Sequence, residues 1–102
     1  MKTETKKRVQ EIKDALIFKV EAMKKYILDQ YPENASANPS VDSKRIMTDH
    51  FSLLENVANR IISFNVMIDK TMLEVRPLNE GQWLENVEKD AEAFMKELNG
   101  LK

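Results

Sequence analysis

The chain has 102 residues, a length typical of one domain, and we predict a single α-helical domain over residues 1–102. Sixteen Lys and Arg residues against seventeen Asp and Glu residues leave a net charge of −1, which offers no bulk attraction to nucleic acid or to an anionic membrane. The absence of cysteine excludes disulfides, thiolate metal sites and cysteine nucleophiles, and two glycines and three prolines are too few for an all-β fold.

Two clusters of helix-breaking residues, at 31–40 and 76–81, divide the chain into three segments with helical periodicity. The predicted helices span about residues 3–30, from near 39 to 76, and 79–99. In the first segment, apolar residues at spacings of three and four predict one narrow buried stripe. This stripe consists of Val9, Ile12, Leu16, Val20, Met23 and Ile27.

The third segment carries the clearest local signals of a helix start. Asn79 is a predicted N-cap, and Gln82 stands at the third helical position, as in a capping box. Leu78 and Trp83 occupy the two positions of a hydrophobic staple. A helix that begins at this point carries an apolar face from Trp83 to Leu98.

The lengths of the three segments predict how they pack. At 1.5 Å per residue they measure roughly 42, 52 and 30 Å, so the third helix is expected to cover only the half of the hairpin near the 76–81 turn. The predicted fold is therefore all-α, an elongated antiparallel three-helix bundle made of a long helical hairpin and a shorter third helix. A break in the second helix near residues 63–65 would convert this fold into a four-helix bundle.

The predicted mismatch leaves the hairpin end next to residues 31–40 with too little cover. An uncovered apolar surface of this kind is typical of an interaction site, so we predict that it is buried in a homodimer or against a protein partner. Phe18 points away from the core stripe, either as an isolated surface aromatic or as part of a second intermolecular face. The predicted interface residues are Phe18, Tyr26, Leu28, Tyr31, Met47, His50, Phe51 and Leu54.

Two polar residues, His50 and Asn65, lie on predicted apolar faces. His50 is the only imidazole, and a packed histidine with a satisfied ring nitrogen is favoured over a general base because no Ser-His-Asp arrangement is visible. No further metal ligands share its face, so we expect no metal, no cofactor and no catalytic residue. Asn65 lies within the apolar stripe of the second helix, where a buried amide often sets the register between helices.

Arg45-Ile-Met-Thr-Asp-His50 resembles the signature of the HEPN superfamily, an arginine and a histidine separated by about four to six residues. The resemblance implies a small all-α, often dimeric protein with ribonuclease or nucleotide-binding activity that uses Arg45 and His50. The sequence departs from the family pattern because the motif opens the second helix and Ile46 follows the arginine. On a regular helix the two side chains also point about 140° apart, so they would have to converge across a dimer.

These observations favour a non-enzymatic, cytoplasmic protein that acts by protein–protein interaction, as an adaptor, regulator or inhibitor, and that self-associates. Nucleic acid is not expected as a partner, because acidic residues interleave with the basic residues near the N-terminus. A membrane span is not expected either, since the longest apolar run is four residues and a span needs roughly 20. The alternatives are a HEPN-like ribonuclease or nucleotide-binding domain and a bundle that binds a small ligand between its helices.

Overall fold

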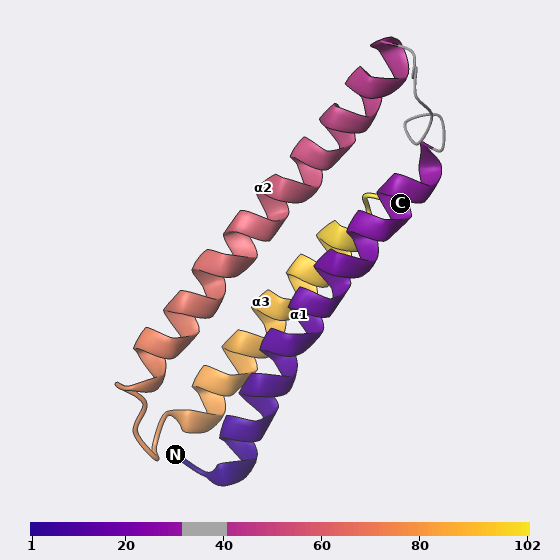
Figure 1. The fold of residues 1–102 in the computed structure, drawn as a ribbon. Helices are drawn as coiled ribbons and strands as arrows, with labels where there is room; N and C mark the ends of the chain where they lie inside the picture. Colours follow the sequence, from indigo (N-terminus) through magenta and orange to yellow (C-terminus); the bar gives the residue numbers. More distant parts are fainter. Residues whose placement is uncertain (32–40) are drawn as a thin grey trace.

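The computed structural model describes residues 1–31 and 41–102, with side chains given from residue 44 onward in the second part. The chain forms three helices, α1 (Thr3–Gln30), α2 (Val41–Met72) and α3 (Glu80–Asn99) (Figure 1). α2 runs antiparallel to α1, and α3 returns along both (Figure 1). The molecule measures 59 × 19 × 18 Å, so the prediction of an elongated, all-α three-helix bundle is confirmed. The predicted breakers at 32–40 lie outside the described residues.

α2 is one continuous helix, so the four-helix alternative is wrong. Residues 63–65 are helical, and no proline or glycine occurs within the helix to interrupt it. Ile61 and Ile68 are buried on either side of the expected break and Phe64 is buried within it, so the helix stays packed on the core there.

The predicted stripe of α1 is buried in full, and its partners come from both other helices. The buried apolar residues of α2 and α3 fall at helical spacings that place them on one side of each helix. They are Leu54, Val57, Ile61, Phe64 and Ile68 in α2 and Val87, Ala91 and Leu98 in α3. Phe64 also packs against Phe94, with ring centroids 5.3 Å apart. The core thus runs between all three helices.

α3 covers more of the hairpin than its length predicts. The carbonyl oxygen of Leu101, just beyond the helix, accepts a hydrogen bond of 2.7 Å from Nε2 of His50 in the first third of α2. A final turn after Asn99 provides this reach, because the backbone N–H groups of Gly100 and Leu101 bond back into α3. Leu54 is consequently buried inside the single chain, which corrects its predicted place on an uncovered surface.

The start of α3 differs from the predicted capping box and staple. The Asn79 side chain makes no capping hydrogen bond, and its Oδ1 instead accepts a bond of 2.8 Å from the backbone N–H of Arg76. Leu78 is fully exposed, so no staple forms with Trp83. Trp83 points toward α2, where its indole N–H donates to the hydroxyl of Thr71 at 3.0 Å. The turn before α3 is therefore held by the asparagine and by contact with α2.

A buried carboxylate joins the start of α3 to the start of α1. Oε1 of Glu80 accepts a hydrogen bond of 3.0 Å from the backbone N–H of Lys2, and its Oε2 accepts one of 3.2 Å from the hydroxyl of Thr5. Lys2 is the N-cap of α1 and offers no side-chain cap, so Glu80 supplies a cap from another helix. Two turns further along, Arg8 bonds to Glu88 at 2.9 Å, and this hydrogen bond raises the pKa of Arg8 above its ordinary value.

Candidate interaction surface

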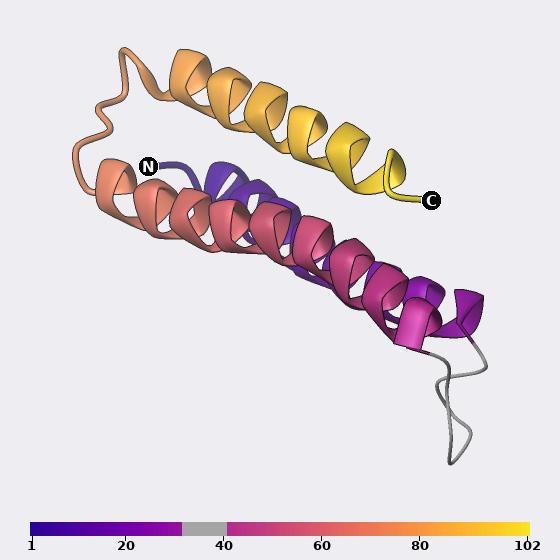
Figure 2. The same ribbon diagram turned by 90° about the horizontal axis from the view of Figure 1, so that it is seen from above.

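α1 and α2 form a two-helix layer that α3 covers on one side only. Viewed along the layer, α3 lies on one side of the α1–α2 pair, and no helix of the described residues lies on the other side (Figure 2). We call the open side the seam face and define it by its apolar residues. These are Ile17 and Leu28 of α1 and Phe51, Ala58 and Ile62 of α2.

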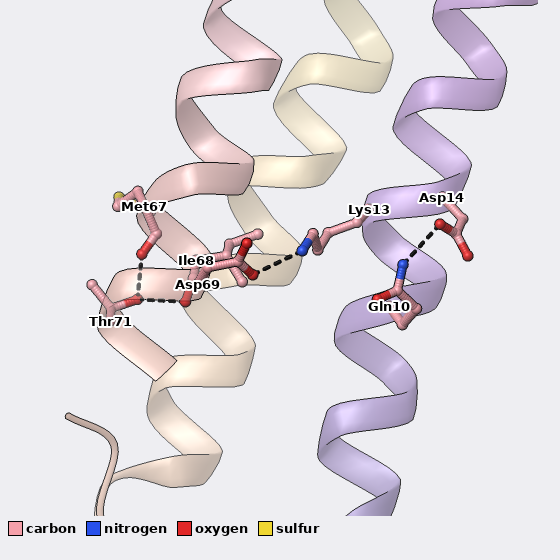
Figure 3. Close-up of polar contacts among 7 residues, drawn as sticks. All are labelled: Gln10, Lys13, Asp14, Met67, Ile68, Asp69 and Thr71. Atoms are coloured by element: carbon pink, nitrogen blue, oxygen red, sulfur yellow. Dashed lines mark hydrogen bonds and ion pairs between the residues drawn. The ribbon is translucent and has the colours of Figure 1, made fainter. Parts of the chain in front are cut away.

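The ion pair between Lys13 and Asp69, at 2.8 Å, identifies which residues belong to the seam face. Lys13 extends from α1 across to Asp69 on α2, and α3 lies behind both helices in this view (Figure 3). Ile17 follows Lys13 by four residues, and Ile62 precedes Asp69 by seven, so each shares a helix face with its member of the pair. The side chains of Ile17 and Ile62 are 52% and 60% exposed.

The seam face is hollowed toward the end of the bundle that lies away from Pro77. Leu54 lines the hollow as its fully buried member, Phe51, Ala58 and Ile62 line it from α2, and the polar Glu55 and Asn59 form its edge on the same helix. Lys24 reaches it from α1, and its ammonium group pairs with Glu21 of the same helix at 3.1 Å. Two bulky side chains with a small alanine between them therefore leave room for an apolar side chain from outside.

Charged and polar side chains mark the other end of the seam face. In addition to the Lys13–Asp69 pair, the amide of Gln10 donates to the carboxylate of Asp14 at 2.9 Å on the outer side of α1 (Figure 3). Thr71 is not part of this border, because its hydroxyl faces α3, where it accepts from Trp83 and donates to the backbone carbonyls of Met67 and Ile68 (Figure 3). An apolar surface with a polar border is the usual composition of a protein interface.

Asn65 lies in α2 between the two ends of the seam face. Its Oδ1 atom is buried and has no hydrogen-bond partner among the described residues. Its side chain shares the face of Asp69, four residues on, and therefore lies beside α1. A buried acceptor without a donor costs free energy, so this amide lowers the stability of the folded single chain.

The eight predicted interface residues fall into four groups. Leu28 and Phe51 belong to the seam face, and Leu54 lies beneath it. Tyr31 and His50 bond to each other, with the tyrosine hydroxyl 3.1 Å from Nδ1. The half-buried Tyr26 and Met47 pack against the core, and Phe18 is 76% exposed, eight residues after Gln10 on the outer side of α1.

His50 is held by hydrogen bonds at both ring nitrogens. Because a carbonyl oxygen can only accept, Nε2 carries the proton that bonds to Leu101, and Nδ1 accepts from the hydroxyl of Tyr31. The Tyr31 and His50 rings also meet edge to face at 6.0 Å. Arg45, the other residue of the HEPN resemblance, is exposed, and within the described residues it forms no hydrogen bond with His50. In the single chain, the imidazole therefore joins α1, α2 and the end of α3.

The remaining grooves of the bundle lie beside α3. The groove between α1 and α3 has Ile12, Ala15, Ala91 and Met95 at its base, and the Arg8–Glu88 pair borders it. The groove between α2 and α3 places Arg60 over the ring of Phe94, 5.8 Å from its centroid. Across residues 1–31 and 44–102, no group of three His, Cys, Asp or Glu side chains could hold a metal ion. No helix in the described ranges has both the length and the apolar character for a membrane crossing.

Ile17, Ala58 and Ile62 are the residues of the seam face that are absent from the predicted interface. The signal was present, because apolar residues in the second half of α2 point in nearly all directions. Two neighbouring helices were expected to cover them all, yet several remain exposed. They are Ile62, Val66, Met67 and Leu73. Two neighbours lie about 60° apart around a helix in a triangular bundle, so they leave its opposite side to solvent.

Comparison of the chain with protein-family models, with curated proteins and with solved structures found no match.

Proposed function

We propose that this chain is a non-enzymatic helical interaction module that self-associates through the seam face. The observation that carries the proposal is the set of large aliphatic side chains that the fold leaves half exposed along one open layer of two helices. Ile17, Leu28 and Ile62 are 52%, 54% and 60% exposed and come from both helices of the layer. Full burial of a side chain of this size contributes about 1.5–3 kcal/mol, so three of them supply a substantial drive to associate.

A second copy of the chain is the occupant that matches the seam face best. The seam face is a two-helix layer whose other side is already packed on α3, and a like layer placed against it completes a four-helix core. Such a pairing uses the same surface on both partners, which is the property of a two-fold dimer. The hollow between Phe51 and Ile62 receives apolar side chains of the second copy in this arrangement.

The test compares two glutamate variants of α2. Ile62 and Leu53 are 60% and 59% exposed, but Leu53 lines a hollow on the α3 side and lies outside the seam face. We expect the wild type to sediment as a dimer at micromolar concentration, Ile62→Glu to sediment as a folded monomer, and Leu53→Glu to remain dimeric. Circular dichroism checks that both variants keep the helical content of the wild type.

A monomeric wild type would overturn the proposal. So would an Ile62→Glu variant that stays dimeric, because that result would place the interface outside the seam face. Loss of the dimer in both variants alike would also overturn it, because the effect would then not be specific to the seam face.

A further inference from the structure

The seam face and its flanks also determine how the two copies are oriented, an inference that rests on the proposed function. We infer that the copies are related by a two-fold axis parallel to the helices, so that α1 of each copy lies antiparallel against α2 of the other. In this arrangement all four neighbouring helix pairs of the central core are antiparallel, as in a regular four-helix bundle.

The register between the copies follows from the contacts within one chain. A rotation about an axis parallel to the helices leaves the height of every residue unchanged. Lys13 bonds to Asp69, and Tyr31 bonds to His50, so the members of each pair lie at the same height along the bundle axis. Between these pairs, an advance of one residue along α1 corresponds to a retreat of about one residue along α2. A residue of α1 therefore lies at the same height as one set of α2 residues in its own chain, and it contacts that same set of α2 residues on the second copy.

The outer flanks of the two helices carry complementary sequences at these levels. On α1, Asp14, Phe18 and Lys25 lie on one face at spacings of four and seven residues, in the order acidic, apolar, basic. On α2, read in the antiparallel direction, Lys70, Val66 and Glu55 follow in the order basic, apolar, acidic. When heights are counted from the Lys13–Asp69 pair, each α1 residue of this set lies about 3 Å along the helix axis from the α2 residue that it faces. This offset is within the reach of the side chains.

In the single chain, the charged members of the two flanks form no ion pair among the described residues, although Asp14 accepts a hydrogen bond from Gln10, and the apolar members are exposed. Among the described residues, none of Asp14, Lys25, Glu55 and Lys70 takes part in an ion pair. Phe18 and Val66 are 76% and 48% exposed. The inferred arrangement pairs Asp14 with Lys70 and Lys25 with Glu55 twice each per dimer, and it covers Phe18 with Val66 of the second copy. Charge complementarity of this kind sets orientation more than affinity.

Charge reversal tests the pairing of Lys25 with Glu55. We expect Lys25→Glu and Glu55→Lys each to raise the dimer dissociation constant about tenfold at low ionic strength, because each dimer holds two such pairs. The double variant Lys25→Glu/Glu55→Lys is expected to restore the wild-type constant. Lys89→Glu makes the same change in net charge on the outer side of α3, where Lys89 pairs with Glu85, and should leave the constant unchanged.

Cross-linking tests the contact between Phe18 and Val66 independently of charge. The chain has no cysteine, so single-cysteine variants report one position each. A mixture of Phe18→Cys and Val66→Cys chains should form a covalent heterodimer with a short bismaleimide, whereas a mixture of Phe18→Cys and Leu53→Cys chains should not. Cross-linking between different chains excludes a contact within one copy.

The outcomes separate this inference from the proposed function. If Ile62→Glu dissociates the dimer but the charge reversals have no effect, or the double variant fails to restore binding, the orientation is wrong and the seam face remains the interface. Equal cross-linking of both cysteine mixtures would also overturn the orientation. Rescue by the double variant together with selective cross-linking would establish it.

Discussion

The buried carboxylate of Glu80 is the side chain on which the contact between the starts of α1 and α3 depends. It accepts hydrogen bonds from the backbone of Lys2 and from Thr5, and both Glu80 and Thr5 are only 7% exposed. A hydrogen bond to a charged and buried acceptor contributes more than one between neutral groups in water, about 1.5–3 kcal/mol.

We therefore expect Thr5→Val, which keeps the shape of the side chain but removes its hydroxyl, to lower the free energy of unfolding by about 1.5–3 kcal/mol. Urea denaturation measures the change. Glu85→Ala is the control, because Glu85 is an exposed acidic residue whose pair with Lys89 lies within α3 and is expected to contribute less than about 0.5 kcal/mol. Equal decreases in the free energy of unfolding in the two variants would show that the hydrogen bond from Thr5 to Glu80 contributes no more than a surface ion pair.

The hydroxyl of Tyr31 is a second single group with a measurable role. Tyr31→Phe keeps the edge-to-face contact with His50 but leaves Nδ1 of the imidazole without its donor. We expect a loss of about 1 kcal/mol in the free energy of unfolding, the usual value for one hydrogen bond. Thermal unfolding followed by circular dichroism measures it, and a phenylalanine variant as stable as the wild type would contradict the hydrogen-bond assignment.

Within α2, the side-chain amide of Asn65 is expected to lower the free energy of unfolding. Its Oδ1 is buried without a donor, and replacement of an unsatisfied polar group by an apolar one of similar size removes the desolvation cost. We expect Asn65→Leu to raise the free energy of unfolding by about 1–3 kcal/mol when it is measured in the Ile62→Glu background. That background removes the contribution of association, and a loss of stability there would show that the amide has a partner in the folded monomer.

The three helices could be predicted from the sequence because each carries an uninterrupted apolar stripe between clusters of helix breakers. The stripe from Val9 to Ile27 is buried as its spacing indicates, and α2 continues through residues 63–65 because nothing in the sequence breaks it. Periodicity reports which face of a helix is buried, and that property depends only on neighbouring residues.

The contacts that join distant parts of the chain could not be predicted in the same way. Thr5 and Glu80 are 75 residues apart, and only the packed bundle brings them together. Asn79 is the N-cap residue of α3 as predicted, but its side chain makes no capping hydrogen bond because it accepts from the backbone of Arg76 in the preceding turn. Ile17 and Ile62 were missed because their exposure depends on the angle between two neighbouring helices, which a single helix face does not specify.

At the scale of the whole molecule, the proposed self-association would link dimer formation to folding. A dimer that forms only from folded chains is stabilised by mass action, so its melting temperature rises with protein concentration. We expect this rise for the wild type and for Leu53→Glu, and a melting temperature independent of concentration for Ile62→Glu. Calorimetry over a hundredfold range of concentration measures it, and a concentration-independent wild type would argue against self-association.

The connection between α2 and α3 lies outside the packed body of the bundle. Leu73 and Leu78 are 88% and 102% exposed, and Pro77 and Leu78 make no contact with the core. The tip of such a connection tolerates an inserted sequence better than any part of the helices does. An epitope or a small fluorescent domain placed between Val75 and Arg76 would keep the Arg76–Asn79 hydrogen bonds and leave the seam face unobstructed. It would give an internal label that follows the protein in cells without a fusion at either terminus.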